Sequence, residues 1–327
     1  MKTRYYVCVA ACFVILIIST FLITSESSGK ASKAARRSSS AKTTSRRHKK
    51  KRVSHCADSP PTNPSHCNIN RNFDVGCDLP WSGGESHEID EHCPNEGCAT
   101  RDQDKAQNGI KNNLCATGTP VQISFTSLDK LQRAVDRKVQ QGQLTYGSSP
   151  PLPADRAKLK GLTTVDVNND AVTLGEGDLV TLDAFVLDAK HDDTFPFGFG
   201  GEGVNCKNSL LEWNDIHVAL GRTRRAQECS SATAEIIPHF RPAVWERIDS
   251  NACTVGHVTN PLPVKRLRVR ITGQLFFDGS HKPSPCGAPS GDGNPLRRSV
   301  WEIHPVYKIE VFDAGRFISF DSWATNH

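Results

Sequence analysis

The sequence lacks most of the short motifs that identify an enzyme. It has no G-x-S-x-G segment, so a serine esterase of the nucleophile-elbow type has no support. It has no C-x-x-C pair, and no second cysteine pair at zinc-ligand spacing follows Cys93 and Cys98. A glycine-rich loop at residues 198–203 is not followed by a helix that could hold a phosphate group. The sequence therefore contains no motif that identifies a reaction. The glycine-rich loop is interpreted as a flexible connection between strands.

Acidic residues are absent from one short basic segment, and the rest of the chain is net negative. The formal net charge is +5, yet residues 30–52 alone contain eleven Lys or Arg. Residues 25–55 are mostly Ser, Ala, Lys and Arg, a composition that cannot bury a core. We interpret residues 25–55 as a disordered basic stalk. Its residues 30–52 are also candidates for binding a polyanion, such as acidic lipid, cell-wall polymer or nucleic acid.

Residues 1–24 have the pattern of a signal-anchor or signal peptide. Lys2 and Arg4 precede an apolar run of about 20 residues, which is long enough to span a bilayer. No A-x-A cleavage site is evident, which favours an uncleaved anchor. The basic segment that follows would remain cytoplasmic by the positive-inside rule, whereas the cysteines indicate export. We follow the cysteines and expect an extracytoplasmic protein that meets the membrane through this segment.

Ten cysteines lie beyond the apolar run. An even number at irregular spacing is typical of disulfides formed in an oxidising compartment. A zinc site at Cys93 and Cys98, with His87 and His92 nearby, is the alternative. Connectivity does not follow from the sequence, and the pair proposed first is Cys206–Cys229, because both residues flank one predicted strand. The ten cysteines are Cys56, Cys67, Cys77, Cys93, Cys98, Cys115, Cys206, Cys229, Cys253 and Cys286.

Residues 56–164 predict a loop-rich extension stapled by cysteines. Six of the ten cysteines fall in residues 56–120, and the extension has too few apolar residues to fold alone. It is therefore expected to pack against the main domain. One helix is predicted at residues 128–141, with Ser127 as N-cap and apolar residues at helical spacing. A short helical turn is predicted at residues 154–162.

Residues 165–321 predict a five-stranded β-barrel. The last strand, WEIHPVYKIEVF, alternates apolar and polar residues, which predicts one solvated face and one buried face. The residues predicted to be buried are Trp301, Ile303, Tyr307, Ile309 and Val311. Pro305 on the same side indicates an edge or a bulge, and Gly273 interrupts the fourth strand. A short helix at residues 242–248 separates the third strand from the fourth. This order is that of the OB-fold, a Greek-key barrel, and the fold class is therefore mostly β. The predicted strands cover residues 178–190, 214–220, 233–240, 265–277 and 301–312.

Four sequence segments resemble segments of other proteins. VNCKNSLLEWNDIHVALG, AEIIPHFRP, VRITGQLFFD and WEIHPV resemble segments of exported bacterial proteins of unassigned function that contain an OB-fold-like domain. The resemblance covers about half of the chain. It implies the barrel and an envelope or secreted location, and it implies no activity.

Three strands each place one carboxylate and one imidazole on the face predicted to point outward. Because these strands are neighbours in an OB barrel, the six side chains are expected to share one surface. Histidine with carboxylate suits a divalent metal, or general acid–base chemistry near neutral pH. His217, His239 and His304 are the candidate metal ligands, and Glu235 or Glu302 the candidate base. The full set of candidate binding residues is Asn214, Asp215, His217, Glu235, His239, Glu302 and His304, with His281 as a weaker loop candidate.

Three functions follow as hypotheses. The first is an extracytoplasmic binding module that presents the barrel face to an unknown ligand. The second is a metal-dependent hydrolase, such as a phosphodiesterase or nuclease. The third is a structural cell-envelope protein whose stalk binds a polyanion. Nucleic acid is disfavoured as a ligand of the barrel, because residues 176–321 contain sixteen Lys or Arg against nineteen Asp or Glu.

Overall fold

A computed structural model describes residues 67, 69–192, 201–208, 210–249, 258, 260–288 and 295–327. The predicted targeting segment 1–24 and stalk 25–55 lie outside these residues, as do Cys56 and Cys253. Within the described ranges, no helix is both long enough and apolar enough to cross a membrane.

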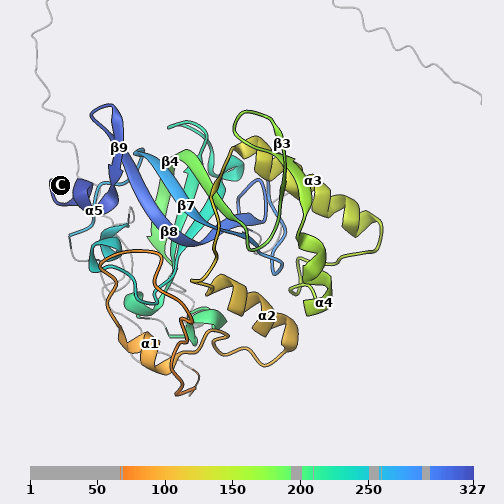
Figure 1. The fold of residues 1–327 in the computed structure, drawn as a ribbon, viewed down its shortest axis with the longest axis horizontal. Helices are drawn as coiled ribbons and strands as arrows, with labels where there is room; N and C mark the ends of the chain where they lie inside the picture. Colours follow the sequence, from red (N-terminus) through yellow and green to blue (C-terminus); the bar gives the residue numbers. More distant parts are fainter. Residues whose placement is uncertain are drawn as a thin grey trace, which may run out of the picture. The chain divides into compact units, whose positions relative to one another are not determined.

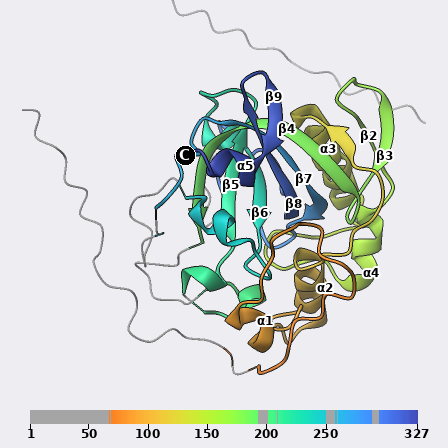
Figure 2. The same ribbon diagram turned by 60° about the vertical axis from the view of Figure 1, so that its left-hand side comes forward.

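Five strands close a barrel, as the sequence predicted (Figures 1 and 2). The strand order is β4-β5-β6-β8-β7, and β7 pairs back with β4 to close the ring. β6 and β8 run parallel, and every other pair in the ring is antiparallel. This is the OB topology. The strands are β4 (Leu179–His191), β5 (Ile216–Gly221), β6 (Ala232–Ile236), β7 (Arg268–Phe277) and β8 (Trp301–Asp313).

Alternating apolar side chains fill the barrel. Along β5, Ile216, Val218 and Leu220 are all buried in the main core, as period 2 requires. The pairing of β7 with β8 shifts register at Gly273, where a Cβ atom would meet the Pro305 carbonyl at 2.3 Å. Glycine is therefore needed at this bulge, which Gly273 and Pro305 had indicated in the sequence.

The bulge changes which residues of β8 point inward. Val306 joins the main core, and Tyr307 instead packs outside the barrel with Phe73, Leu114 and Ile237. The prediction that Tyr307 faces inward was wrong, because a uniform alternation does not survive the register shift. The predicted third strand is also too long, since β6 ends at Ile236 and Phe240 packs with the outer group rather than inside the barrel.

Smaller elements cover the ends and one side of the barrel. Helix α3 (Phe125–Gln140) was predicted, but its N-cap is Ser124, with Ser127 completing the capping box from inside the helix. The predicted helix at 242–248 is a 3-10 helix, Ala243–Arg247. The remaining elements are β1 (Val121–Ile123), which pairs parallel with β4, α4 (Pro153–Arg156), the hairpin β2 (Leu162–Val165) and β3 (Ala171–Leu174), β9 (Arg316–Ser319), and α5 (Phe320–Ala324).

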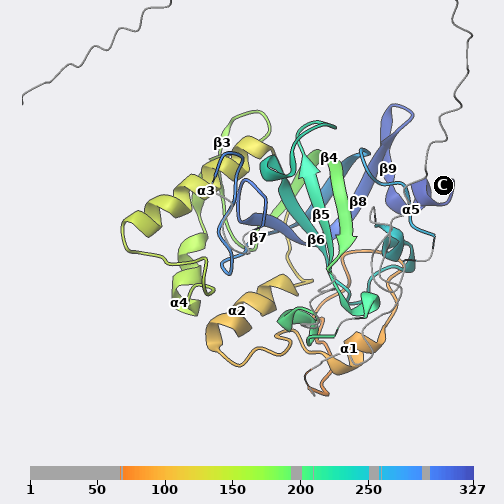
Figure 3. The ribbon, with the colours of Figure 1, turned by 180° about the vertical axis from the view of Figure 1, so that it is seen from behind.

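The N-terminal extension packs against the outer surface of the barrel, as expected from its composition. It carries α1 (Glu88–His92) and α2 (Asp102–Lys111), which lie together at one end of the strands (Figures 1 and 3). The Trp81 indole N–H donates to the Phe240 carbonyl at 2.8 Å, and the Tyr307 hydroxyl donates to the Asn113 carbonyl at 2.6 Å. The outer face of β6 and β8 is therefore an interface rather than a solvated surface.

Four disulfides staple the described domain, and none is the predicted Cys206–Cys229 pair. Cys206 pairs with Cys93 instead, and this bond joins the extension to the loop after β4. Cys93 and Cys98 belong to two different disulfides, so neither is available for zinc. Four disulfides are typical of a protein that folds in an oxidising compartment. The pairs are Cys67–Cys98, Cys77–Cys115, Cys93–Cys206 and Cys229–Cys286.

Candidate functional site

Four acid and histidine side chains meet on the outer face of β5, β6 and β8. We call Asp215, Glu235, Glu302 and His304 the acid–histidine cluster. Their exposed fractions are 0%, 4%, 1% and 0%. The sequence placed these residues on the outward face, which is correct, and predicted a solvated face for Glu302 and His304, which is wrong. The extension buries these side chains. Alternation along a strand predicts which side chains point outward, but not which segment of the chain covers them.

Glu235 lies at the centre of the group. Its Oε2 atom is 2.7 Å from Nδ1 of His304, and its Oε1 atom is 3.6 Å from Nε2 of His217. On the far side of the imidazole, Nε2 of His304 is 3.9 Å from Oδ2 of Asp215. Two of the three predicted histidines therefore converge, one on each oxygen of the same carboxylate.

His239 does not join them. Its Nδ1 atom lies 2.7 Å from Oδ1 of Asp90 on helix α1, and its ring packs against Phe73 at 3.9 Å between centroids. The prediction of His239 as a metal ligand beside His217 and His304 is thus corrected. The cause is the early end of β6 at Ile236, after which the chain turns and strand parity no longer sets side-chain direction. Asn214 bonds its own loop, donating to the Leu210 carbonyl at 2.6 Å.

Several charged residues around the cluster were missed by sequence reasoning. Lys111, at the end of α2, places its ammonium 2.9 Å from Oε2 of Glu202 and 3.7 Å from Oε2 of Glu235. Arg297 forms ion pairs with Glu302 and Asp278. Residues in a loop or on a separate helix give no strand pattern, so no local signal in the sequence points to Lys111, Glu202 or Arg297.

The local electrostatics are dominated by carboxylates. Burial raises the pKa of Asp215 to about 6. Burial opposes the charged form of His304, but the Glu235 carboxylate outweighs it and raises the pKa of His304 to about 10. For Glu235, the cations His217, Lys111 and His304 outweigh burial and hold the pKa well below its usual range. The cluster therefore favours a positive charge at its centre.

Some buried polar atoms of the cluster make no hydrogen bond within the protein. Oδ2 of Asp215 and Nε2 of His304, 3.9 Å apart, are buried and make no hydrogen bond to any described residue, whereas Nδ1 of His304 is ion-paired with Oε2 of Glu235 at 2.7 Å. Leaving such atoms unpaired is costly, and buried charges normally pair or coordinate metals. Asp215, Glu235 and His304 each present one ligand atom, and these three atoms lie within 4.8 Å of one another. The three residues, which we call the first triad, fit a divalent metal ion.

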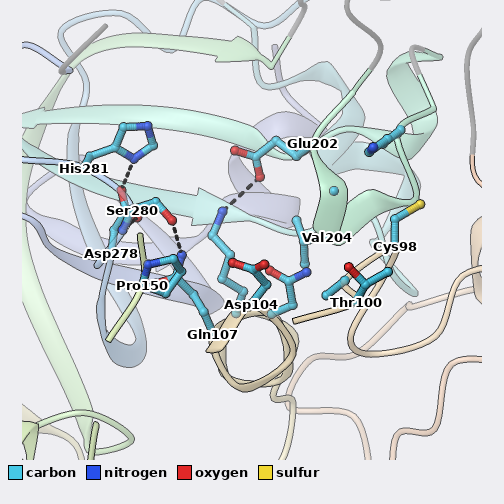
Figure 4. Close-up of a pocket in the computed structure, with 15 residues that line it drawn as sticks. Cys98, Thr100, Asp104, Gln107, Pro150, Glu202, Val204, Asp278, Ser280 and His281 are labelled. Carbon is cyan, nitrogen blue, oxygen red and sulfur yellow. Dashed lines mark hydrogen bonds and ion pairs between the residues drawn. The ribbon is translucent and has the colours of Figure 1, made fainter. Parts of the chain in front are cut away.

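Two pockets are lined by residues that contact the cluster. The first has a volume of about 390 Å³ and is lined by polar groups that include Gln107, Lys111, Glu202 and Asp278 (Figure 4). The weaker candidate His281 lines the same pocket, with Nδ1 2.6 Å from Oδ2 of Asp278. The second has a volume of about 210 Å³ and includes residues His217 and Arg297. The acid–histidine cluster is therefore buried yet lies next to solvent-accessible space.

No protein-family model, curated protein or solved structure matches this chain. The function is therefore argued from the geometry and chemistry of this site.

Proposed function

We propose that this protein is an exported metal-binding module, in which the first triad holds a divalent transition-metal ion. The observation that carries the proposal is that Asp215, Glu235 and His304, all buried, each present one ligand atom within 4.8 Å of the others, while Oδ2 of Asp215 and Nε2 of His304 make no hydrogen bond to a described residue. One imidazole with two carboxylates is a donor set suited to Zn²⁺ or Mn²⁺. Export is supported by the four disulfides and by the apolar N-terminal run, whose retention as an anchor is part of the proposal.

A metal ion explains why this polar group is buried at all. The extension buries Asp215, Glu235, Glu302 and His304 against the barrel, so this part of the β5–β6 face is closed to a large ligand. A small cation needs no open face, and it would neutralise carboxylates that Lys111 and Arg297 only partly balance. The unknown ligand of the barrel face is therefore proposed to be an inorganic ion.

Metal content provides the test. The full-length protein is purified, incubated with Zn²⁺ or Mn²⁺, desalted and analysed by elemental mass spectrometry. We expect retained metal in the wild type, loss of metal in His304→Gln, and a lower unfolding midpoint after chelator treatment. His239→Gln is the matched control, because His239 is equally buried beside a carboxylate but lies outside the cluster. Absence of metal in the wild type, with an unfolding midpoint unaffected by chelator, would contradict the proposal.

Metal-dependent hydrolysis is a second candidate function. It is favoured by the polar pocket beside the cluster, which brings Lys111 and Glu202 next to space large enough for a small substrate. Glu302 would be the base that takes a proton from the attacking water, because its Oε2 atom lies 3.6 Å from Nδ1 of the proposed ligand His304 and burial raises its pKa. The water oxygen would then bond to phosphorus as the ester oxygen leaves and takes up a proton.

A phosphodiester probe tests this second candidate. Release of p-nitrophenol from bis(p-nitrophenyl) phosphate is measured for the metal-loaded wild type and for Glu302→Gln. We expect a loss of about 10²-fold or more in the variant if Glu302 is the base. Equal rates in the wild type, the variant and buffer would reject hydrolysis of phosphodiesters and leave metal binding untouched.

A further inference from the structure

A second triad of the same composition lies beside the first. Asp192, Glu202 and His217 each offer one ligand atom, and these atoms lie within 4.8 Å of one another. The triad is assembled from the end of β4, the following loop and β5. Like the first triad, it combines two carboxylates with one imidazole, and the two triads share no residue.

Glu235 connects the two triads through its separate oxygens. Oε2 faces His304 of the first triad at 2.7 Å, and Oε1 faces His217 of the second triad at 3.6 Å. The Glu235 side chain is 5% exposed. Nε2 of His217 makes no hydrogen bond to a described residue, although the His217 side chain as a whole is 29% exposed. A carboxylate with one oxygen directed at each of two ligand sets has the arrangement of a bridging ligand in a two-metal site.

The charge of the second triad also favours a cation. Lys111 already places its ammonium 2.9 Å from Oε2 of Glu202, which shows that this position attracts positive charge.

We propose that the site is a two-ion centre, in which Asp192, Glu202 and His217 hold a second divalent ion and Glu235 bridges the two ions. This inference rests on the proposed metal-binding function. Glu202 lines the larger pocket and His217 the smaller one, whereas the residues of the first triad line neither. The second ion therefore reaches solvent and keeps coordination positions for water or for an oxyanion ligand, while the first is enclosed. The first ion is the slowly exchanging one, and the second is the exchangeable one.

Metal stoichiometry distinguishes this inference from the proposed function. The full-length protein, its His217→Gln variant and its His304→Gln variant are loaded with Mn²⁺ and analysed by elemental mass spectrometry and by electron paramagnetic resonance. We expect about two ions per chain in the wild type, with the spectrum of a coupled pair, because bridged ions lie about 3.5–4 Å apart. We expect about one ion and an uncoupled spectrum in His217→Gln.

Each other outcome has one meaning. One uncoupled ion in both the wild type and His217→Gln, lost in His304→Gln, would overturn the two-ion inference and leave the proposed function intact. No ion in the wild type would overturn both. Two uncoupled ions that survive in His217→Gln would overturn the assignment of the second triad. Asp188→Asn, which alters a carboxylate of the smaller pocket that belongs to neither triad, is the control and should retain two ions.

Discussion

The inside of the barrel and the acid–histidine cluster on its outer face are both buried, but they are built from opposite chemistry. Inside, β5 contributes Ile216, Val218 and Leu220 to one apolar core. Outside, the neighbouring strands β6 and β8 contribute Glu235, Glu302 and His304 to the acid–histidine cluster under the extension. The inner face needs only complementary shape, whereas the outer face needs each charge to be balanced by a specific partner. The difference shows that burial alone does not identify the core of this domain.

The largest expected effect comes from removing a cation on the outer side. Arg297→Met leaves Glu302 and Asp278 buried without their shared partner, and we expect the free energy of unfolding to fall by about 3–5 kcal/mol. Urea denaturation of the wild type and the variant measures this difference in the free energy of unfolding. Arg298→Met is the matched control, because Arg298 pairs with Asp129 at a more exposed position and should cost about 1 kcal/mol or less. Equal effects of the two variants would contradict the buried-network interpretation.

A substitution inside the barrel should lower stability without changing the metal content. Leu182→Ala removes a side chain that is 1% exposed inside the barrel, and we expect a loss of about 2–5 kcal/mol in urea denaturation. The metal content of the folded variant should equal that of the wild type. If Leu182→Ala loses metal while folded, the two sides of the strands are not independent, and the comparison drawn above fails.

The disulfide that joins the extension to the barrel is the next test. Replacing Cys93 and Cys206 by Ser opens a link between residues 113 positions apart, and we expect a loss of about 2–4 kcal/mol together with weaker metal retention. Replacing Cys229 and Cys286, 57 positions apart, should cost a similar free energy and leave metal retention unchanged. Matching metal loss in both double variants would show that the extension has no particular role over the site.

The smallest expected effect is a pH dependence on a different part of the outer surface. Burial opposes ionisation of Glu246, but Arg241 and His191 outweigh it and lower the pKa of Glu246 to about 2 from an ordinary 4.5. Because the folded-state pKa is depressed, the stabilisation is present above pH 4.5 and is lost as the pH falls toward 2. We expect Glu246→Gln to lose about 2 kcal/mol near neutral pH and to show a flatter decline in stability below pH 4.5. A parallel decline in both proteins would contradict this assignment.

The sequence by itself determined the barrel. Period-2 runs were enough to predict five strands, and the glycine in β7 and the proline in β8 indicated the bulge, because these signals are local to each strand. The spatial order came from the succession of strands and helix, which matched the OB-fold. The same parity placed Asp215, His217, Glu235, Glu302 and His304 on the outer face. Parity stopped being informative where regular structure stops, which is why His239 and Tyr307 were placed wrongly.

Only the tertiary structure decided what covers the outer face and what completes the site. Lys111, Glu202 and Arg297 come from a helix and two loops, and their positions follow from long-range packing and from disulfides such as Cys93–Cys206. Pairing of distant cysteines depends on how the whole chain is brought together, and no spacing rule encodes it. A strand pattern states which side chains point outward, whereas the burial and charge of that surface depend on the segment that packs against it.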